Sequence, residues 1–226
     1  MTTALRQIGL LTGKDLRIEA RSKHTIGLVV VLGILILVVL GLGLGQQNTA
    51  TSGPAATAIL WVAFLFSGVL CFEKTMAVER NDGALAALLL APVDRGVIYL
   101  AKLLSNLALM VAMALVITPV AVLFFHFDLS AAPGRFVTIM ALSFVGLAAV
   151  GTLFAAAVSS TRLQGGLLAM VVFPICLPLV ITSTQLTLNL GHDAGDKLLS
   201  GLPVLIAFDV IYLIVSWLVF ELILEP

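Results

Sequence analysis

The sequence predicts an all-α integral membrane protein with six transmembrane helices and both termini in the cytoplasm. Three observations predict it: an apolar composition, six long apolar stretches and an uneven distribution of Lys and Arg. Of 226 residues, 61% are hydrophobic and 11% are charged, whereas a soluble domain has about 45–50% apolar and about 25% charged residues. A core of this size cannot bury so many apolar side chains, so lipid must solvate part of them. Twelve basic and twelve acidic residues cancel, and no nucleic-acid partner is expected.

Six stretches are long enough to cross a bilayer. A spanning helix needs about 20 apolar residues, because the hydrocarbon core is about 30 Å thick and a helix rises about 1.5 Å per residue. Membrane-spanning strands are excluded, because they alternate between two faces and the run that begins at Ile26 does not alternate. The predicted spans cover about residues 25–45, 54–72, 103–125, 136–159, 163–182 and 202–220.

The orientation follows from the Lys and Arg residues, which are enriched in cytoplasmic segments of membrane proteins. With the N-terminus inside, the outer segments contain only Arg135 and Lys197. An even number of spans returns the C-terminus to the cytoplasm. The predicted cytoplasmic basic residues are Arg6, Lys14, Arg17, Arg21, Lys23, Lys74, Arg80, Arg95, Lys102 and Arg162. We therefore expect one transmembrane domain over residues 1–226, without a separable soluble module.

Residues 2–23 are predicted to form an amphipathic helix that lies at the membrane interface. At 100° per residue, four basic residues share an arc of about 80°; they are Arg6, Lys14, Arg17 and Arg21. The other side carries the apolar residues Leu5, Ile8, Leu11, Leu16 and Ile18. Asp15 and Glu19 interrupt that apolar side. The alternative is a basic cytoplasmic extension that only sets the orientation of the chain.

The cytoplasmic segment 73–102 contains a short helix-prone run at 84–91. Pro92 ends this run, because the residue before a proline is pushed out of the α region. Leu85, Leu88 and Leu89 share one face at helical spacing. A small apolar face on the aqueous side of the membrane usually binds a partner. The alternative is a re-entrant or interfacial loop that only shields the bundle.

The residues of this segment resemble a known pattern. Glu79, Arg80, Gly83, Leu85, Leu88, Pro92 and Lys102 are spaced as in the intracellular loop of ABC-2-type transporter permeases. Within that fold, the order of several further marks resembles the CcmB family, the permease subunits of ABC complexes for cytochrome c maturation. These marks are the segments 14–17, 59–62 and 82–93, followed by Arg162, Gly165, Gly166, Pro174 and Pro178.

The resemblance implies a function in a protein assembly of a bacterial inner membrane. The loop between the second and third transmembrane helices would contain the coupling helix, which docks on a separate ATPase. The residues expected to take part are Glu79, Arg80, Asp82, Gly83, Leu85, Leu88 and Pro92. The expected partners are a CcmA-like ABC ATPase in two copies, a CcmC-like haem-handling membrane protein, a small CcmD-like membrane subunit, the haem chaperone CcmE and membrane lipid. The complex would couple ATP hydrolysis to haem delivery or to release of the loaded chaperone; the alternative is an ABC-2 permease that exports another small or lipidic substrate.

The chain itself is expected to be a non-catalytic subunit. Gly13 and Lys14 resemble the end of a phosphate-binding loop, but Ile8 stands where its first Gly is needed and Asp15 replaces the Ser or Thr that would bind magnesium. ATP and Mg²⁺ are therefore expected on the partner ATPase. A secondary transporter would normally show an inverted repeat and several intramembrane polar residues, and a membrane enzyme would need a catalytic pair at matching depth.

Haem is expected on partner subunits, and no metal site is expected. The three histidines, His24, His126 and His192, are interpreted as polar residues near the membrane boundaries, without a Trp-rich outer segment to stack on a porphyrin. Asp209 is the acid deep within a span, and it is a possible intramembrane polar site because such acids are rare and usually functional.

The two cysteines are expected to be packing residues. Cys71 lies near the inner end of the second span and Cys176 lies in the middle of the fifth. Their depths differ too much for a disulfide bond.

Overall fold

The structure is a computed structural model that describes residues 2–22, 24–43, 49–81, 94–126, 132–159, 166–190 and 195–223. Within these residues all regular structure is helical, which confirms the all-α prediction. The helices are α1 (Thr2–Ser22), α2 (His24–Gly43), α3 (Thr49–Asn81), α5 (Arg95–Phe125), α6 (Pro133–Ser159), α7 (Leu167–Leu188) and α8 (Gly195–Ile223). Six of them, all except α1, contain a stretch long and apolar enough to cross a membrane, as predicted.

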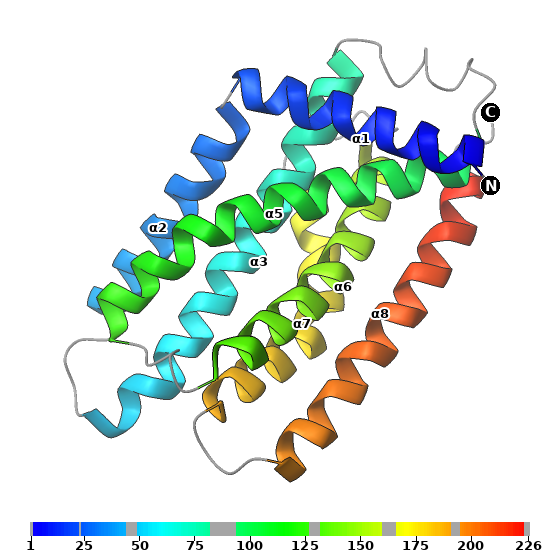
Figure 1. Ribbon diagram of the computed structural model, residues 1–226. Helices are drawn as coiled ribbons and strands as arrows, with labels where there is room; N and C mark the ends of the chain where they lie inside the picture. The colour runs from blue at the N-terminus through cyan, green and yellow to red at the C-terminus, as the bar shows by residue number, and fades with distance from the viewer. Residues whose placement is uncertain are drawn as a thin grey trace.

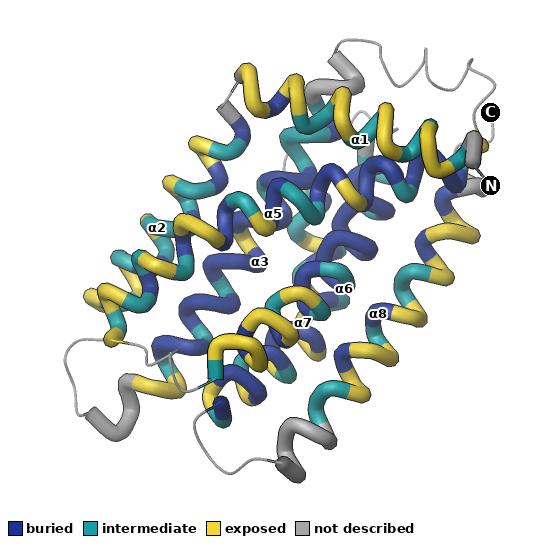
Figure 2. The backbone as a smooth tube through the Cα atoms, viewed as in Figure 1, coloured by how far each residue is buried: buried dark blue, intermediate teal, exposed yellow. Residues whose placement is uncertain are grey.

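The six long helices run side by side as a bundle, and α1 lies across one end of it (Figure 1). The start of α1 and the end of α8 lie at this same end, which is the predicted cytoplasmic end. The central helices are α3 and α6, in which 72% of the most apolar stretch is buried, against 17% in α2 and α8 (Figure 2). The exposed apolar side chains of α2 and α8 therefore form much of the surface available to lipid.

Several helices continue beyond their predicted spans. At the cytoplasmic end, α3 reaches Asn81 and α5 already begins at Arg95. Asp94 caps α5, because its Oδ1 accepts a hydrogen bond from the amide of Gly96 at 3.1 Å. A hydropathy profile shows where the chain enters lipid, whereas a helix continues through the headgroup layer until its backbone is capped or broken.

The segment 183–201, between the fifth and sixth predicted spans, is also largely helical. The helix α7 runs on to Leu188 and α8 begins at Gly195, so several polar residues beyond the predicted spans lie within helices. Among them, Thr184 Oγ1 donates to the carbonyl of Val180 at 2.8 Å. Such an internal bond lets a polar side chain remain in an apolar helix.

Close contacts between α3 and α6 form the centre of the core. The rings of Phe64 and Phe144 meet edge to face with centroids 5.2 Å apart, a favourable arrangement for aromatic pairs. Nearer the cytoplasmic end, Gly151 of α6 packs directly against the ring of Phe72, where a Cβ would collide. Small residues allow membrane helices to approach closely, so this glycine sets the spacing of α3 and α6.

Candidate coupling site

A buried ion pair joins α1 to the start of α5. Lys102 Nζ lies 2.6 Å from Asp15 Oδ2, and the two side chains are 7% and 14% exposed. Ser105 Oγ, one turn further along α5, lies 3.4 Å from the same carboxylate oxygen. Lys14 Nζ approaches the other oxygen, Asp15 Oδ1, at 3.0 Å. Each carboxylate oxygen therefore has a charged partner, as a buried charge requires.

Two further side chains of α1, Thr12 and Glu19, hold the helix in place through three hydrogen bonds. Thr12 Oγ1 donates to the carbonyl of Ala101 on α5 at 3.2 Å. Glu19 Oε1 accepts hydrogen bonds from the amides of Thr25 and Ile26 at 3.0 and 3.3 Å. These amides belong to the first turn of α2, where backbone N–H groups lack partners within the helix and a negative charge is stabilising.

The side of α1 on which the sequence places Asp15 and Glu19 among apolar residues is turned in part toward the bundle. Asp15 and Glu19 contact α5 and α2. Leu5 and Ile18, from the same predicted side, are 66% and 45% exposed. Helical periodicity shows which residues share a face, but it does not show whether protein or lipid covers that face.

A second set of buried polar contacts joins α5 to α3 and α6. Thr75 Oγ1 of α3 donates to Asn106 Oδ1 at 3.0 Å. Asn106 Nδ2 donates in turn to Thr152 Oγ1 of α6 at 2.9 Å. Asn106 and Thr152 are 1% and 0% exposed. The asparagine thus uses both ends of its amide to connect three helices.

The first turns of α5 also contact α6 and α8. Tyr99 OH donates to the carbonyl of Ala149 on α6 at 3.5 Å, and Ser216 Oγ of α8 donates to the same carbonyl at 3.3 Å. The ring of Tyr99 packs on Phe220 of α8, with centroids 5.2 Å apart. We refer to Tyr99, Lys102, Ser105 and Asn106 together as the polar hub.

The polar hub lies next to the segment that the sequence singles out. The helix α3 ends at Asn81 and α5 begins at Arg95, so the chain between them leads directly into α5, the helix that carries the hub. Through its four side chains the hub contacts α1, α3, α6 and α8. A movement of the start of α5 would therefore displace the four helices that the hub contacts.

The predicted coupling residues lie largely outside the described part of the chain. Glu79 and Arg80 belong to the last turn of α3, although the placement of their side chains is not described. Asp82, Gly83, Leu85, Leu88 and Pro92 lie outside the described residues, so the coupling helix stays a prediction. The hub was not predicted. Its signals in the sequence are an acid on the apolar side of α1, a lysine at the start of a span and an asparagine within an apolar run.

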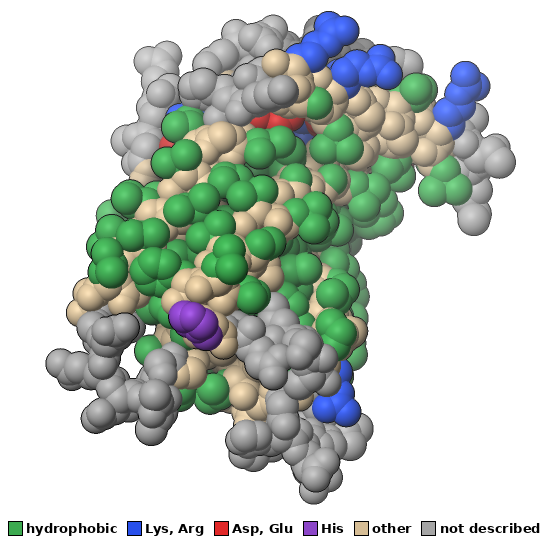
Figure 3. Space-filling model, turned by 60° about the vertical axis from the view of Figure 1, so that its left-hand side comes forward, with side chains coloured by type: hydrophobic (Ala, Val, Ile, Leu, Met, Phe, Trp, Pro, Cys, Tyr) green, Lys and Arg blue, Asp and Glu red, His purple; other side chains and the backbone are tan. Residues whose placement is uncertain are grey.

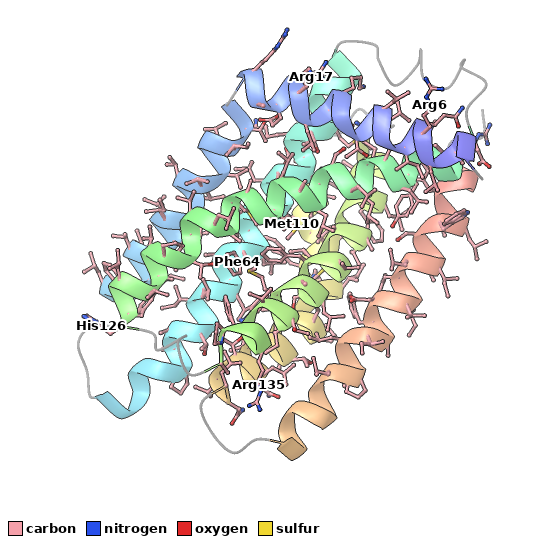
Figure 4. All side chains as sticks on the ribbon, viewed as in Figure 1. Arg6, Arg17, Phe64, Met110, His126 and Arg135 are labelled. Carbon is pink, nitrogen blue, oxygen red and sulfur yellow. The ribbon has the colours of Figure 1, made fainter. Side chains whose placement is uncertain are left out.

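The predicted interface residues are all exposed on α1. Arg6 and Arg17 are labelled on α1 in Figure 4, at the end of the bundle opposite to His126 and Arg135. Phe64 and Met110 mark the interior between the helices (Figure 4), and each is at most 1% exposed. The four predicted interface residues therefore lie on a basic helix face outside the packed core; they are Arg6, Lys14, Arg17 and Arg21.

Asp209 lies apart from the polar hub. It is 5% exposed on α8, and its Oδ1 has no hydrogen-bond partner within the described residues. The carboxylate packs against Gly146 of α6, where a Cβ would collide with it and with Leu179. The described residues therefore give this acid a tight environment, in which none of them is hydrogen-bonded to Oδ1.

The described residues contain no cluster of three or more His, Cys, Asp or Glu that could bind a metal ion. His126 is exposed at the end of α5, with a left-handed backbone φ of 54°. The side chain of His24 and the whole of His192 are outside the described part. Cys71 and Cys176 are both buried and unpaired, as predicted.

Comparison with known proteins matches residues 6–224 to the family model described as "CcmB protein". Three similar proteins bear the name "Heme exporter protein B". The one from Paracoccus denitrificans is 29% identical over 173 residues, which cover 76% of this chain and 78% of the relative. The relative from Rhodobacter capsulatus is 24% identical over 176 residues, covering 78% and 80%. The relative from Bradyrhizobium diazoefficiens is 26% identical over 181 residues, covering 77% and 78%.

Proposed function

The chain belongs to the CcmB family, and on that basis we propose that it is the permease subunit of an ABC complex for cytochrome c maturation. It couples ATP hydrolysis by a separate ATPase to haem delivery or to release of a haem-loaded chaperone. The names of its relatives, heme exporter protein B, support the link to haem. The proposed setting is a bacterial inner membrane, with CcmA-like, CcmC-like and CcmD-like subunits and a CcmE-like chaperone. ATP and Mg²⁺ bind to the ATPase, and haem binds to partner subunits.

The observation that carries the coupling function is the position of the polar hub. Coupling between distant sites needs packed and hydrogen-bonded elements that both sites can bias. The hub provides such contacts immediately after the segment 82–93, where the ATPase is proposed to dock. Lys102 connects α5 to α1 through Asp15, while Asn106 connects it to α3 and α6.

The proposed mechanism is mechanical. Closure of two ATP-bound ATPase subunits displaces the segment 82–93 together with the ends of α3 and α5. The ion pair carries α1 along with α5, and the Thr75–Asn106–Thr152 contacts transmit the displacement to α6. Because α6 crosses to the outer end of the bundle, its movement reaches the face where haem is handed over. We favour release of the chaperone from a CcmC-like partner over passage of haem through this subunit, since haem handling in the family falls to that partner.

The test uses the apolar anchors of the proposed coupling helix. Leu85→Asp combined with Leu88→Asp should abolish co-purification of the ATPase, because burial of unpaired carboxylates is far more unfavourable than the loss of methyl groups. Leu85→Met combined with Leu88→Met retains apolar anchors of similar volume and should co-purify normally. Both variants should insert into the membrane, since neither residue lies in a predicted span. Normal recovery of the ATPase with the aspartate variant would overturn the docking assignment.

Cytochrome assembly separates the proposed function from its alternative. A strain lacking this chain should lose holo-cytochrome c, and the wild-type gene should restore it. Two results together would instead favour export of another small or lipidic substrate: normal cytochrome c in the strain that lacks the chain, and binding of the ATPase to the chain purified from the wild type.

A further inference from the structure

The charges of α1 are separated by the tertiary structure. The helix carries four basic and two acidic residues, and both acids are turned toward the protein. Asp15 pairs with Lys102, and Glu19 caps α2. The opposite side of α1 therefore presents basic residues without an acidic side chain among them. Lys14 shares Asp15, whereas Arg17 and Arg21 project from the exposed side.

The contacts of α1 also indicate its depth in the membrane. The helix α5 has 31 residues, about 46 Å, so it exceeds the hydrocarbon core by about 16 Å, or about 8 Å at each end. Lys102 lies seven residues after Arg95, about 10 Å along the helix. The ion pair with Asp15 thus lies near the boundary of the hydrocarbon core. Thr25, whose amide Glu19 binds, is the first residue of the neighbouring span. The helix α1 therefore lies in the headgroup layer of the cytoplasmic leaflet.

A depression of about 410 Å³ lies on the side of α1 that faces away from α5 and α2, and the described residues that line it all belong to α1. Lys14, Arg17 and Arg21 contribute its basic groups, while Leu10 and Ile18 contribute apolar groups. Gly9 and Gly13 also line it, and a Cβ added at either would meet no atom within 4 Å. In Figure 3 most of the visible Lys and Arg side chains lie at this end of the molecule, beyond the apolar surface of the bundle.

We infer that this depression binds the phosphate group of an anionic phospholipid of the cytoplasmic leaflet. A guanidinium group binds two phosphate oxygens at once, and Arg17 and Arg21 are one helical turn apart. Leu10 is 65% exposed and Ile18 45% exposed, and they would contact the upper acyl chain below the headgroup. A depth at the headgroup layer, together with exposed apolar side chains, matches a lipid better than a soluble anion or an acidic protein surface. The inference is independent of the proposed coupling function.

Native mass spectrometry of the purified full chain tests this site. The protein is incubated with equal amounts of phosphatidylglycerol and phosphatidylcholine, and the bound lipids are counted. The wild type should retain phosphatidylglycerol selectively. Arg17→Gln combined with Arg21→Gln should weaken that binding by about fivefold for each charge at low salt. The difference should shrink in 1 M salt, where the Debye length falls to about 3 Å.

Three controls make the result decisive. Arg135→Gln removes an exposed arginine at the other end of the bundle and should leave binding unchanged. Arg17→Lys combined with Arg21→Lys retains the charge and should keep most of the selectivity. This result would show that the glutamine variant loses binding because it lacks the charges and not because it misfolds. Inorganic phosphate at the same concentration should not displace the lipid. Undiminished phosphatidylglycerol binding in the glutamine variant, equal loss in Arg135→Gln, or displacement by phosphate alone would each overturn the assignment.

Discussion

Single polar residues determine how α1 is attached to the bundle. Asp15 and Lys102 come from segments 87 positions apart and meet at 2.6 Å in a site with little exposure to solvent. In such a site the attraction between the two charges is strong, but so is the penalty for leaving either one unpaired. The pair therefore specifies one position of α1 on α5.

Removal of one partner should be more harmful than removal of both. Lys102→Met leaves Asp15 with a buried oxygen that has lost its closest cation, and should destabilise the protein by about 3–5 kcal/mol. Lys102→Met combined with Asp15→Leu should recover a large part of that loss. Thermal unfolding of the purified variants in detergent measures the difference. Lys14→Met is the control, because Lys14 is 41% exposed and a surface pair contributes about 0–1 kcal/mol. Equal losses in the single and double variants would show that the pair is not coupled.

The same substitution at two glycines should have opposite effects. Gly151→Ala places a methyl group against the ring of Phe72, and overpacking of this kind costs about 1–3 kcal/mol. Gly27→Ala meets no atom within 4 Å, and alanine favours a helix over glycine by up to about 1 kcal/mol. Unfolding temperatures of the two variants should therefore lie on either side of the wild type. A stable Gly151→Ala variant would mean that α3 and α6 can separate without loss.

At the scale of the elements, α5 connects the cytoplasmic segment to the bundle. Its first three turns contact α1 through Lys102, α3 and α6 through Asn106, and α8 through Tyr99. A helix that is hydrogen-bonded and packed on several sides moves together with its neighbours. In the proposed mechanism this property lets a local push at 82–93 act on the whole domain.

Asn106→Leu should separate folding from coupling. Interhelical hydrogen bonds in membrane proteins contribute on average about 0.6 kcal/mol each, so loss of two such bonds should leave the chain folded. If α5 transmits the movement of the ATPase, the yield of holo-cytochrome c per ATP hydrolysed should fall, while the ATPase remains bound. Thr138→Val is the control, because Thr138 is exposed near the outer end of α6. An unchanged yield per ATP in Asn106→Leu would exclude the hub from coupling.

At the scale of the whole molecule, two well-buried helices are surrounded by helices that face lipid. Burial is highest in α3 and α6 and lowest in α2 and α8. Six crossings bring the start of α1 and the end of α8 to the same end of the bundle (Figure 1). The basic residues of α1 lie at that end (Figure 4), which is the cytoplasmic end in the orientation predicted from the Lys and Arg distribution.

Reporter fusions test this topology in cells. Fusions after Asn81 and at the C-terminus should report the cytoplasm, because each follows an even number of crossings. Fusions at 44–48 and 191–194 should report the periplasm. A fusion at 127–131, between α5 and α6, provides a third periplasmic position. A periplasmic C-terminus would contradict the six-span topology and the proposed location of the ATPase.

Local properties of the sequence were sufficient for the fold class and for the basic face of α1. Hydropathy over about 20 residues identifies a span, and periodicity of 3.6 residues places Arg6, Arg17 and Arg21 on one face of α1. The segment 82–93 was recognised from its own residues and its resemblance to ABC-2 permeases, and its docking role stays a prediction. None of these inferences requires knowledge of which helices touch.

The contacts that make up the hub depend on packing between distant segments. The sequence shows Asp15 as an acid misplaced on an apolar face, but its partner follows 87 residues later. Asn106 and Thr152 are 46 residues apart and lie within apolar runs that resemble every other span. Lipid-facing and protein-facing residues are equally apolar in a membrane helix, so hydropathy cannot show which faces meet. The close packing of α1, α3, α5 and α6 decides it, because a buried polar group is stable only where another group can pair with it.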